Sequence, residues 1–222
     1  MPKKDMERRI NQTPSGTGAG GVLVVPNSAS IPPTAGPDIR VSGYQVSRAG
    51  AGVLLFSGAG ALLAEYAADA TGLAAALAAM AAGDVVRWYA GTITGDFTIP
   101  PGCTLEGIGP DSIIAGLVTG GADSRFRTAA VVRTANQVGI LAGVTVGATG
   151  TFYVDADVNV QNSGGPAYAV YMTQGGNIRV NGDLLAEVGT DGYAAWVSSG
   201  DFYHDAGRAI GTVALTPYWK EV

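Results

Sequence analysis

The sequence predicts an all-β fold, a right-handed single-stranded parallel β-helix with an N-terminal capping α-helix and an extended N-terminal arm. Three observations lead to this prediction: an internal repeat with a period in the mid-twenties, short apolar strands that each end at Gly or Pro, and an unusual composition. Glycine contributes 34 of the 222 residues and charged residues make up 14%, where about a quarter is usual. This composition suits a β-structure with many tight turns better than a solvated helical bundle.

The internal repeat is clearest in the C-terminal half of the chain. One period apart, Tyr168 matches Tyr193 and Tyr171 matches Trp196. A period in the mid-twenties is typical of a solenoid, in which each coil buries its apolar face by stacking on the next. Residues 84–215 have room for roughly five such coils. The side chains expected to point into the coils are those of Val154, Val158, Val160, Val180 and Leu184.

The chain is expected to have three parts. Residues 1–37 form an extended arm, because residues 26–37 alone hold four of the eleven prolines, and proline removes a hydrogen-bond donor and fixes φ. Residues 38–83 contain short strands and the capping helix. Residues 84–222 form the β-helix and a C-terminal tail, which is expected to cover the far end of the stack.

The capping helix is predicted at residues 61–82. Asp69 or Thr71 can cap its start, and Gly83 stands where a left-handed residue commonly ends a helix. The open end of a β-helix exposes unpaired strand edges, and a helix before the first coil is well placed to cover it. The apolar face of this helix consists of residues at i, i+3, i+4 and i+7, namely Leu73, Ala76, Leu77 and Met80.

The composition excludes several kinds of site. The single cysteine, Cys103, rules out an intrachain disulfide and a metal site built on several thiolates, and the single histidine, His204, rules out a histidine-rich metal site. We therefore expect neither a metal nor a cofactor, and we expect a buried structural thiol at Cys103. The net charge is −5 and the basic residues are scattered, so no nucleic-acid partner is expected.

We expect neither a signal peptide nor a membrane span. The first dozen residues are charged and polar, and the apolar run at residues 22–25 is too short for a signal sequence. The Ala/Leu-rich stretch at residues 61–82 is interrupted by Glu65, Asp69 and Gly72, so membrane insertion is not expected. The protein is expected to be made in a cytoplasm.

The best candidates for catalytic residues are four aspartates that the repeat gathers on neighbouring coils: Asp155, Asp157, Asp183 and Asp205. Asp155 and Asp157 lie two residues apart on one strand, so both face outward. Clustered carboxylates can bind Ca²⁺ or share the acid and base roles of sugar cleavage. The alternative is a ladder of Asp and Asn side chains that only connects the coils. A lyase would also need a basic residue on that face, and Arg179 and Arg208 do not align, so no catalytic residue is assigned.

Four aromatic residues are the candidates for a binding surface or an interface. The repeat stacks Tyr168 on Tyr193 and Tyr171 on Trp196, and strand alternation places the two pairs on opposite faces. Exposed stacked aromatics can bind sugar rings or a protein partner, and the alternative is packing within the coil. His204 aligns with an inward-facing position, which favours a packing histidine over a catalytic base.

One segment carries a family resemblance. An Ala/Leu-rich helix leads through Gly83-Asp84 to a strand, and the motifs FTIP (97–100), GCTLEG (102–107) and DSII (111–114) follow. This order of motifs over residues 72–116, about a fifth of the chain, resembles the entry segment of the pectin-lyase-like parallel β-helix superfamily. The resemblance implies the fold. It does not choose a function, because that superfamily includes polysaccharide lyases and hydrolases, phage tailspikes, and non-catalytic virion and surface proteins.

These observations favour a structural protein of a virus particle, most simply a phage tail fibre or tailspike component or a capsid decoration protein. The low charge suggests that much surface is buried against partners, which are expected to be further copies in a homotrimer and other virion proteins that contact the arm. Contact with host-surface polysaccharide is also expected, and the location is the virion. The alternatives are a polysaccharide lyase or glycoside hydrolase of the same fold, and an exported bacterial surface or adhesion module.

Overall fold

The computed structural model of the chain describes residues 39–41, 44–46, 52–147, 149–188, 192–210, 212–215 and 220–221. The arm predicted at residues 1–37 lies outside the described residues. The chain divides into two units, Met1–Ala51 and Gly52–Val222. In the first unit, the short strands β1 (Ile39–Val41) and β2 (Tyr44–Val46) pair antiparallel.

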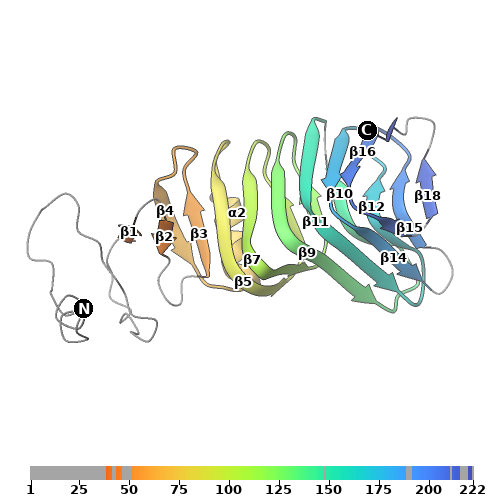
Figure 1. The fold of residues 1–222 in the computed structure, drawn as a ribbon, viewed down its shortest axis with the longest axis horizontal. Helices are drawn as coiled ribbons and strands as arrows, with labels where there is room; N and C mark the ends of the chain where they lie inside the picture. The colour runs from red at the N-terminus through yellow and green to blue at the C-terminus, as the bar shows by residue number, and fades with distance from the viewer. Residues whose placement is uncertain are drawn as a thin grey trace, which may run out of the picture. The chain divides into compact units, whose positions relative to one another are not determined.

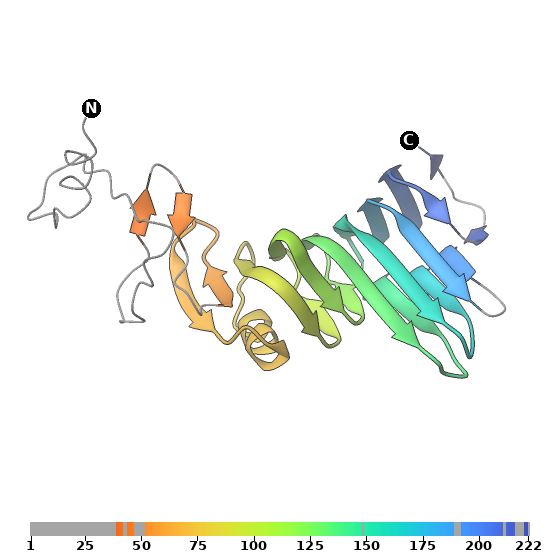
Figure 2. The ribbon, with the colours of Figure 1, turned by 60° about the horizontal axis from the view of Figure 1, so that its bottom comes forward.

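The second unit is a parallel β-helix of about five turns, which confirms the predicted fold class (Figures 1 and 2). The strands form a larger and a smaller sheet, and each successive coil contributes strands to both sheets. The larger sheet contains the parallel strands β5 (Val85–Thr94), β7 (Thr104–Ala115), β9 (Arg125–Ala135), β11 (Thr151–Asn162), β13 (Asn177–Asn181), β14 (Leu184–Val188), β16 (Asp201–Ala206), β17 (Ala209–Ile210) and β19 (Lys220–Glu221). The smaller sheet contains β6 (Phe97–Ile99), β8 (Val118–Gly120), β10 (Leu141–Val146), β12 (Ala167–Met172), β15 (Gly192–Val197) and β18 (Thr212–Leu215).

Each coil has three sides. The long strands of the larger sheet are interrupted by a shift in the pairing register, which lies between Asp155 and Asp157 in β11. We call the segments before the interruption the first side; they are residues 85–89, 104–108, 125–128, 151–155, 177–181 and 201–206. The second side consists of the segments that follow the interruption, and its last two strands are β14 and β17. The six strands of the smaller sheet form the third side.

The strand register confirms the alignment of the internal repeat. Tyr168 lies opposite Tyr193 and Tyr171 opposite Trp196 in neighbouring coils. The coils are not equally long, because Glu106 and its neighbour Arg127 are 21 residues apart in the chain. The corresponding separation is 26 residues for Asp155 and Asn181 in the C-terminal half. This difference in length explains why the repeat is visible in the sequence only in the C-terminal half.

The interior of the coils is a continuous apolar core. The five residues predicted to point inward are all buried there: Val154, Val158, Val160, Val180 and Leu184. Phe126 and Phe152, from consecutive coils, are among the largest fully buried side chains. Because burying one such large apolar side chain contributes about 1.5 to 3 kcal/mol, stacking of the coils supplies the main favourable term of folding.

The capping helix is shorter than predicted. The structure places α2 at Ala70–Ala78, and the first part of the predicted segment is instead β4 (Leu62–Tyr66). This strand pairs antiparallel with β3 (Val53–Phe56), which pairs antiparallel with β5. The side chains of β4 alternate between half-buried and exposed, which is the pattern of an edge strand on a core. The prediction at residues 61–69 was therefore wrong, because pairing with β3 outweighs the helix propensity of an Ala/Leu-rich run.

Both ends of α2 have a clear cause. Asp69 is the N-cap, and its Oδ1 accepts a hydrogen bond of 2.7 Å from the Gly72 N–H, which satisfies one of the free donors of the first turn. The helix ends at Ala79, whose N–H donates to carbonyls of the last turn. Gly83 was predicted to end the helix and does not; its φ of +92° forms the turn before β5 instead.

The helix covers the core at the N-terminal end of the β-helix, as predicted. Leu73, Ala76 and Leu77 are buried and belong to the same apolar cluster as the first coil. The predicted buried thiol is also present, since Cys103 is 1% exposed and its Sγ lies 3.2 Å from the Ala81 carbonyl. Burial, followed by the charge of Asp84, raises the pKa of this thiol. Within the described residues, no helix is long and apolar enough to cross a membrane.

A buried asparagine holds the corner between the second and third sides. Asn162 is 1% exposed, and its Oδ1 accepts hydrogen bonds from the Gln137 and Gly164 N–H groups at 3.1 and 3.3 Å. Its Nδ2 donates to the carbonyls of Gly139 and Pro166 at 2.9 and 3.2 Å. The four bonds connect the loops of two successive coils, in addition to the backbone bonds from Ser163 to Ala135 and from Leu141 to Pro166.

Candidate functional site

A band of polar side chains runs across the coils on the outer face of the first side. Strand register places these side chains in two rows, because β7, β9, β11 and β13 each contribute one residue to each row and the two are separated by one inward-facing residue. The first row consists of Arg87, Glu106, Arg127, Asp155 and Asn181. The second row consists of Thr104, Arg125, Tyr153, Arg179 and Tyr203. We call these ten residues the Arg/Tyr strip.

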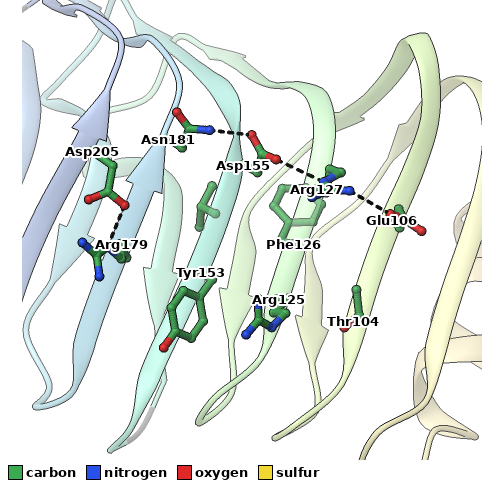
Figure 3. A pocket seen from close by; sticks show the side chains of 11 residues that line it. Thr104, Glu106, Arg125, Phe126, Arg127, Tyr153, Asp155, Arg179, Asn181 and Asp205 are labelled. Carbon is green, nitrogen blue, oxygen red and sulfur yellow. Dashed lines mark hydrogen bonds and ion pairs between the residues drawn. The ribbon is translucent and has the colours of Figure 1, made fainter. Parts of the chain in front are cut away.

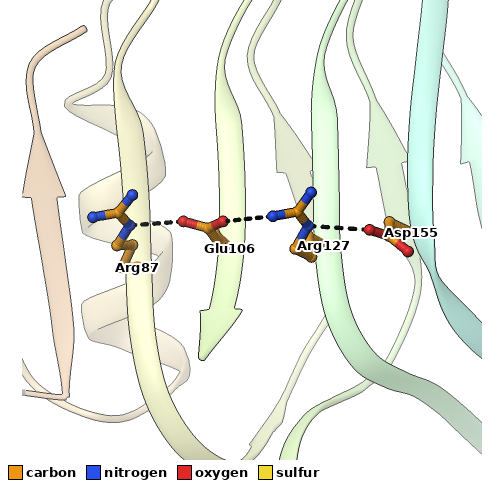
Figure 4. A network of polar contacts seen from close by, with 4 residues as sticks. All are labelled: Arg87, Glu106, Arg127 and Asp155. Carbon is orange, nitrogen blue, oxygen red and sulfur yellow. Dashed lines mark hydrogen bonds and ion pairs between the residues drawn. The ribbon is translucent and has the colours of Figure 1, made fainter. Parts of the chain in front are cut away.

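The first row is a chain of ion pairs in which the sign of the charge alternates from coil to coil (Figure 4). Arg87 Nε lies 2.7 Å from Glu106 Oε2, and Arg127 Nη1 lies 3.3 Å from Glu106 Oε1. Arg127 Nε also lies 3.1 Å from Asp155 Oδ2, and the amide of Asn181 donates to Asp155 Oδ1 at 3.1 Å. Every carboxylate in this row is therefore already held by an arginine.

The second row pairs arginines with tyrosines. The guanidinium of Arg125 lies over the ring of Tyr153, 4.8 Å from its centroid, and that of Arg179 lies 5.5 Å from the ring centroid of Tyr203. Such contacts hold a cation on an aromatic face. Among the described residues, Arg125 has no carboxylate partner, so its N–H donors remain available to a ligand.

Asp205 joins the strip through a register shift in β16. The pairing with β13 shifts after Val180 and His204, and Asn181 is opposite Ala206, so Asp205 is the extra residue. Its Oδ2 lies 2.6 Å from Arg179 Nε (Figure 3). This hydrogen bond and the charge of Asp205 raise the pKa of Arg179 above its ordinary value.

The strip contains a shallow groove of about 320 Å³. Figure 3 shows Tyr153 and Arg125 along one edge and Asp155 with Arg127 along the other. The groove is lined by Thr104, Glu106, Arg125, Phe126, Arg127, Tyr153, Val154, Asp155, Arg179, Asn181 and Asp205. The lining therefore combines aromatic faces, hydrogen-bond donors and acceptors from successive coils.

The four candidate aspartates do not form one cluster. Asp155 and Asp205 lie in the groove, whereas Asp157 and Asp183 lie beyond the bend between the first and second sides. There, Asp157 Oδ1 accepts a hydrogen bond of 2.8 Å from the Asp183 N–H in the next coil. Asp183 in turn accepts from the backbone N–H and from Nε and Nη2 of Arg208 at 2.8, 3.0 and 2.7 Å. These bonds lower the pKa of Asp183, and both aspartates connect successive coils.

The four candidate aromatic residues form a single cluster, which corrects the prediction of two opposite faces. The rings of Tyr168 and Tyr193 stack at 5.1 Å, Tyr171 lies 5.0 Å from Tyr168, and Trp196 contacts Tyr193 edge-on at 5.3 Å. The alternation fails because the strand bends: Ala169 and the residue after it are both fully buried. Residues three apart then project from the same face, which is the outer face of the third side.

His204 is a packing histidine, as predicted. It lies opposite Val180 in the preceding coil and is stacked with Phe202 at 6.3 Å. Its Nε2 is 2.9 Å from the carbonyl oxygen of Gly182, and because a carbonyl only accepts, Nε2 is the protonated nitrogen. A nitrogen that donates to the backbone cannot act as the base for a nucleophile.

No family model matches the chain, and no similar protein was found among curated proteins or solved structures. Within the residues described, no group of three or more His, Cys, Asp or Glu side chains could hold a metal ion.

The groove is better suited to recognition than to bond cleavage. Glycoside hydrolysis needs a pair of carboxyl groups that flank the scissile bond, whereas Asp155 is engaged by Arg127 at 3.1 Å and Asp205 by Arg179 at 2.6 Å. A lyase that used Arg179 as its base would need that guanidinium to release its proton easily, and Asp205 has the opposite effect on its pKa. Polar and aromatic side chains in fixed positions remain, which is what binding requires.

The sequence reasoning missed most of the strip. Glu106, Arg125, Arg127 and Tyr153 were not singled out, although each lies at the i, i+2 spacing of an outward-facing pair. The signal was present in the segments RFR (125–127), YVD (153–155) and RVN (179–181). It becomes visible only when the coils are aligned with unequal offsets, because Arg125 and Tyr153 are 28 residues apart, whereas Tyr153 and Arg179 are 26 apart.

Proposed function

We propose that the protein is a structural and attachment component of a virus particle, of the phage tail fibre, tailspike or capsid decoration kind, and that it binds an elongated host-surface glycan along the Arg/Tyr strip without cleaving it. The observation that carries the proposal is the strip: two straight rows of donors, acceptors and aromatic rings that cross successive coils and lack a free acid–base pair.

The geometry of the strip matches an extended ligand. Neighbouring coils are about 4.8 Å apart, so a chain laid along the axis of the β-helix meets a new pair of side chains at each coil. Tyr153 and Tyr203 offer ring faces to the apolar faces of sugars, and Arg125 offers donors to hydroxyl or carboxylate oxygens. A scaffold of stacked coils holds these groups rigidly, which lowers the entropic cost of binding.

The particle assignment is supported by features of the whole chain. Charged residues are only 14% of the sequence, which fits a protein that buries surface against partners. We propose that these partners are further copies in a homotrimer and other virion proteins, with residues 1–37 as the contacting arm. The mature location is then the virion.

The test is a binding survey with purified host-surface polysaccharides, measured by calorimetry on the full chain. Arg125→Ala is expected to weaken binding about tenfold or more, because a hydrogen bond to a charged group contributes about 1.5 to 3 kcal/mol. Tyr153→Ala is also expected to weaken binding, because it removes a ring face for the sugar and the ring that supports Arg125. Thr134→Ala, an exposed change on the second side, is the matched control and leaves affinity unchanged.

Two results would contradict the proposal. Failure to bind any polysaccharide of the host surface would remove the attachment role. Release of shortened glycan that stops in Asp155→Asn would favour the alternative of a polysaccharide lyase or glycoside hydrolase.

A further inference from the structure

The third side of the β-helix is free of charge. Its six strands read FTI, VTG, LAGVTV, AYAVYM, GYAAWV and TVAL, without one Asp, Glu, Lys or Arg. On the first side, by contrast, every strand from β5 to β16 carries at least one charged residue. Composition therefore differs between two faces of the same stack of coils.

The outward-facing residues of the third side form a regular column. Strand register aligns Thr98, Thr119, Thr145, Tyr171 and Trp196 from one coil to the next. All five are exposed or half-buried. The hydroxyl of Thr145 donates to the Tyr171 carbonyl at 2.6 Å, so part of the polar capacity of this column is already used within the protein.

The aromatic cluster lies beside the C-terminal end of this column. Tyr171 and Trp196 are members of both, and Tyr168 and Tyr193 stack next to them. Tyr168 is only 7% exposed, yet it lies outside the main apolar core. The other three rings are half-buried, so they present aromatic surface outward.

An uncharged face with aromatic residues toward one end has the composition of an interface centre. Interface centres are depleted in charged residues and enriched in Tyr, Trp and Phe. A sheet face that stays in water commonly carries charged residues, which also prevent unwanted association. The strands of the third side carry no such charged residues, which indicates that this face is covered by another molecule.

We propose that the third side is the face through which copies of this chain meet. The inference rests on the homo-oligomer included in the proposed function and identifies its contact surface. The occupant follows from charge: the chain carries a net charge of −5, so contact through most of its surface sets like charges together. The third side avoids this, because the uncharged faces of several copies can meet around a shared symmetry axis without repulsion.

The area of the face fits a weak interface. Its six strands are three to six residues long, so at about 3.3 Å per residue and a spacing of about 4.8 Å they cover about 450 Å². Two copies then bury about 900 Å², which is in the range of weak, transient interfaces. The aromatic cluster is expected to provide most of the binding free energy, because Trp and Tyr dominate such interfaces.

The test uses the full chain in the absence of any glycan. Light scattering during size-exclusion chromatography is expected to give the wild type a multiple of the 22.3 kDa chain mass. Trp196→Glu is expected to shift the protein to the monomer mass, with association weakened about 30-fold or more, as for the loss of a hot spot. Thr134→Glu, which places the same charge on the second side, is the control and keeps the wild-type mass.

A second measurement avoids a substitution as disruptive to the structure as Trp196→Glu. Thr145→Cys puts a thiol in the column, while Cys103 is 1% exposed and does not react. A short bismaleimide is expected to cross-link Thr145→Cys into covalent dimers and to leave Thr134→Cys uncross-linked.

The proposal is overturned by a wild type that is monomeric at all concentrations, or by equal cross-linking of the two cysteine variants. It is also overturned if folded Trp196→Glu keeps the wild-type mass, and loss of glycan binding in that variant would then show that the face binds the ligand. Since association is measured without glycan, failure of the strip to bind polysaccharide leaves these outcomes unchanged.

Discussion

The guanidinium of Arg125 lies on the ring of Tyr153, which belongs to the next coil of the β-helix, with 4.8 Å between the guanidinium carbon and the ring centroid. The contact joins two coils and also fixes the direction in which the free donors of Arg125 point. A side chain that is positioned before the ligand arrives loses little entropy on binding. Some residues of the strip hold neighbouring coils together, whereas others remain available to a ligand.

The two carboxylates of the first row are expected to differ in their effect on stability. Glu106 is 15% exposed and contacts two arginines, whereas Asp155 is 49% exposed. Glu106→Gln is expected to lower the free energy of unfolding by about 1 to 2 kcal/mol, and Asp155→Asn by less than about 1 kcal/mol, because exposed pairs are screened by solvent. Urea denaturation of both variants measures the difference, and equal losses would contradict it.

Asn162 is expected to be the most sensitive polar residue of the coil corners. Asn162→Ala leaves two backbone donors and two carbonyls without their partner, which predicts a loss of about 3 kcal/mol. Asn159→Ala is the matched control on the same strand, because Asn159 Oδ1 is buried without a hydrogen bond. Thermal denaturation should show a large decrease in Tm for the first variant only. Similar melting of the two variants would disprove the role of Asn162.

Acid stability is expected to depend on Asp183. Its pKa is lowered in the folded protein by Arg208, so folding is favoured when Asp183 is ionised. The contribution is fully present above the ordinary Asp pKa of about 3.9 and is lost as the pH falls through the lower folded value. Asp183→Asn and Arg208→Gln should both reduce the pH dependence of the free energy of unfolding in this acid range. A wild-type pH dependence in both variants would exclude this pair as a source.

Gly120 is expected to tolerate no side chain. A Cβ at this position would overlap the ring of Phe152 in the core, whereas a Cβ at Gly139 meets no atom within 4 Å. Gly120→Ala should therefore destabilise the protein by about 1 to 3 kcal/mol through overpacking. Gly139→Ala serves as the control and should remain within about 0.5 kcal/mol of the wild type. Chemical denaturation of both proteins measures the contrast, and a stable Gly120→Ala would show that the core can shift.

The fold could be predicted because residues one coil apart are similar enough in the sequence to reveal the repeat period. The match of Tyr168 with Tyr193 gave the register of β12 and β15, and alternating valines gave the core of β11. The predicted helix was too long because residues 62–66 have a partner, β3, that composition cannot reveal. The strand bend at Ala169 was also invisible, since a strict two-residue alternation assumes a straight strand.

The candidate site was predicted only in part, and for a related reason. Asp155 and Asp205 were found because they lie in the region of the clear repeat. Arg125 and Glu106 belong to the first coils, where the offset of the C-terminal half fails. Asp205 was expected near Asp155, yet it pairs with Arg179 because a register shift in β16 moves it by one position. Such local shifts depend on packing between coils, and a sequence pattern does not encode them.

The two-row strip also has a consequence for how a protein of this kind can change. Because each coil adds one residue to each row, insertion or loss of a whole coil would lengthen or shorten the strip by a fixed step of about 4.8 Å and leave the remaining pairs in place. The number of coils therefore sets the length of ligand that the strip can bind. Duplication of one coil from the C-terminal half would lengthen the strip by one coil spacing without redesign of the fold.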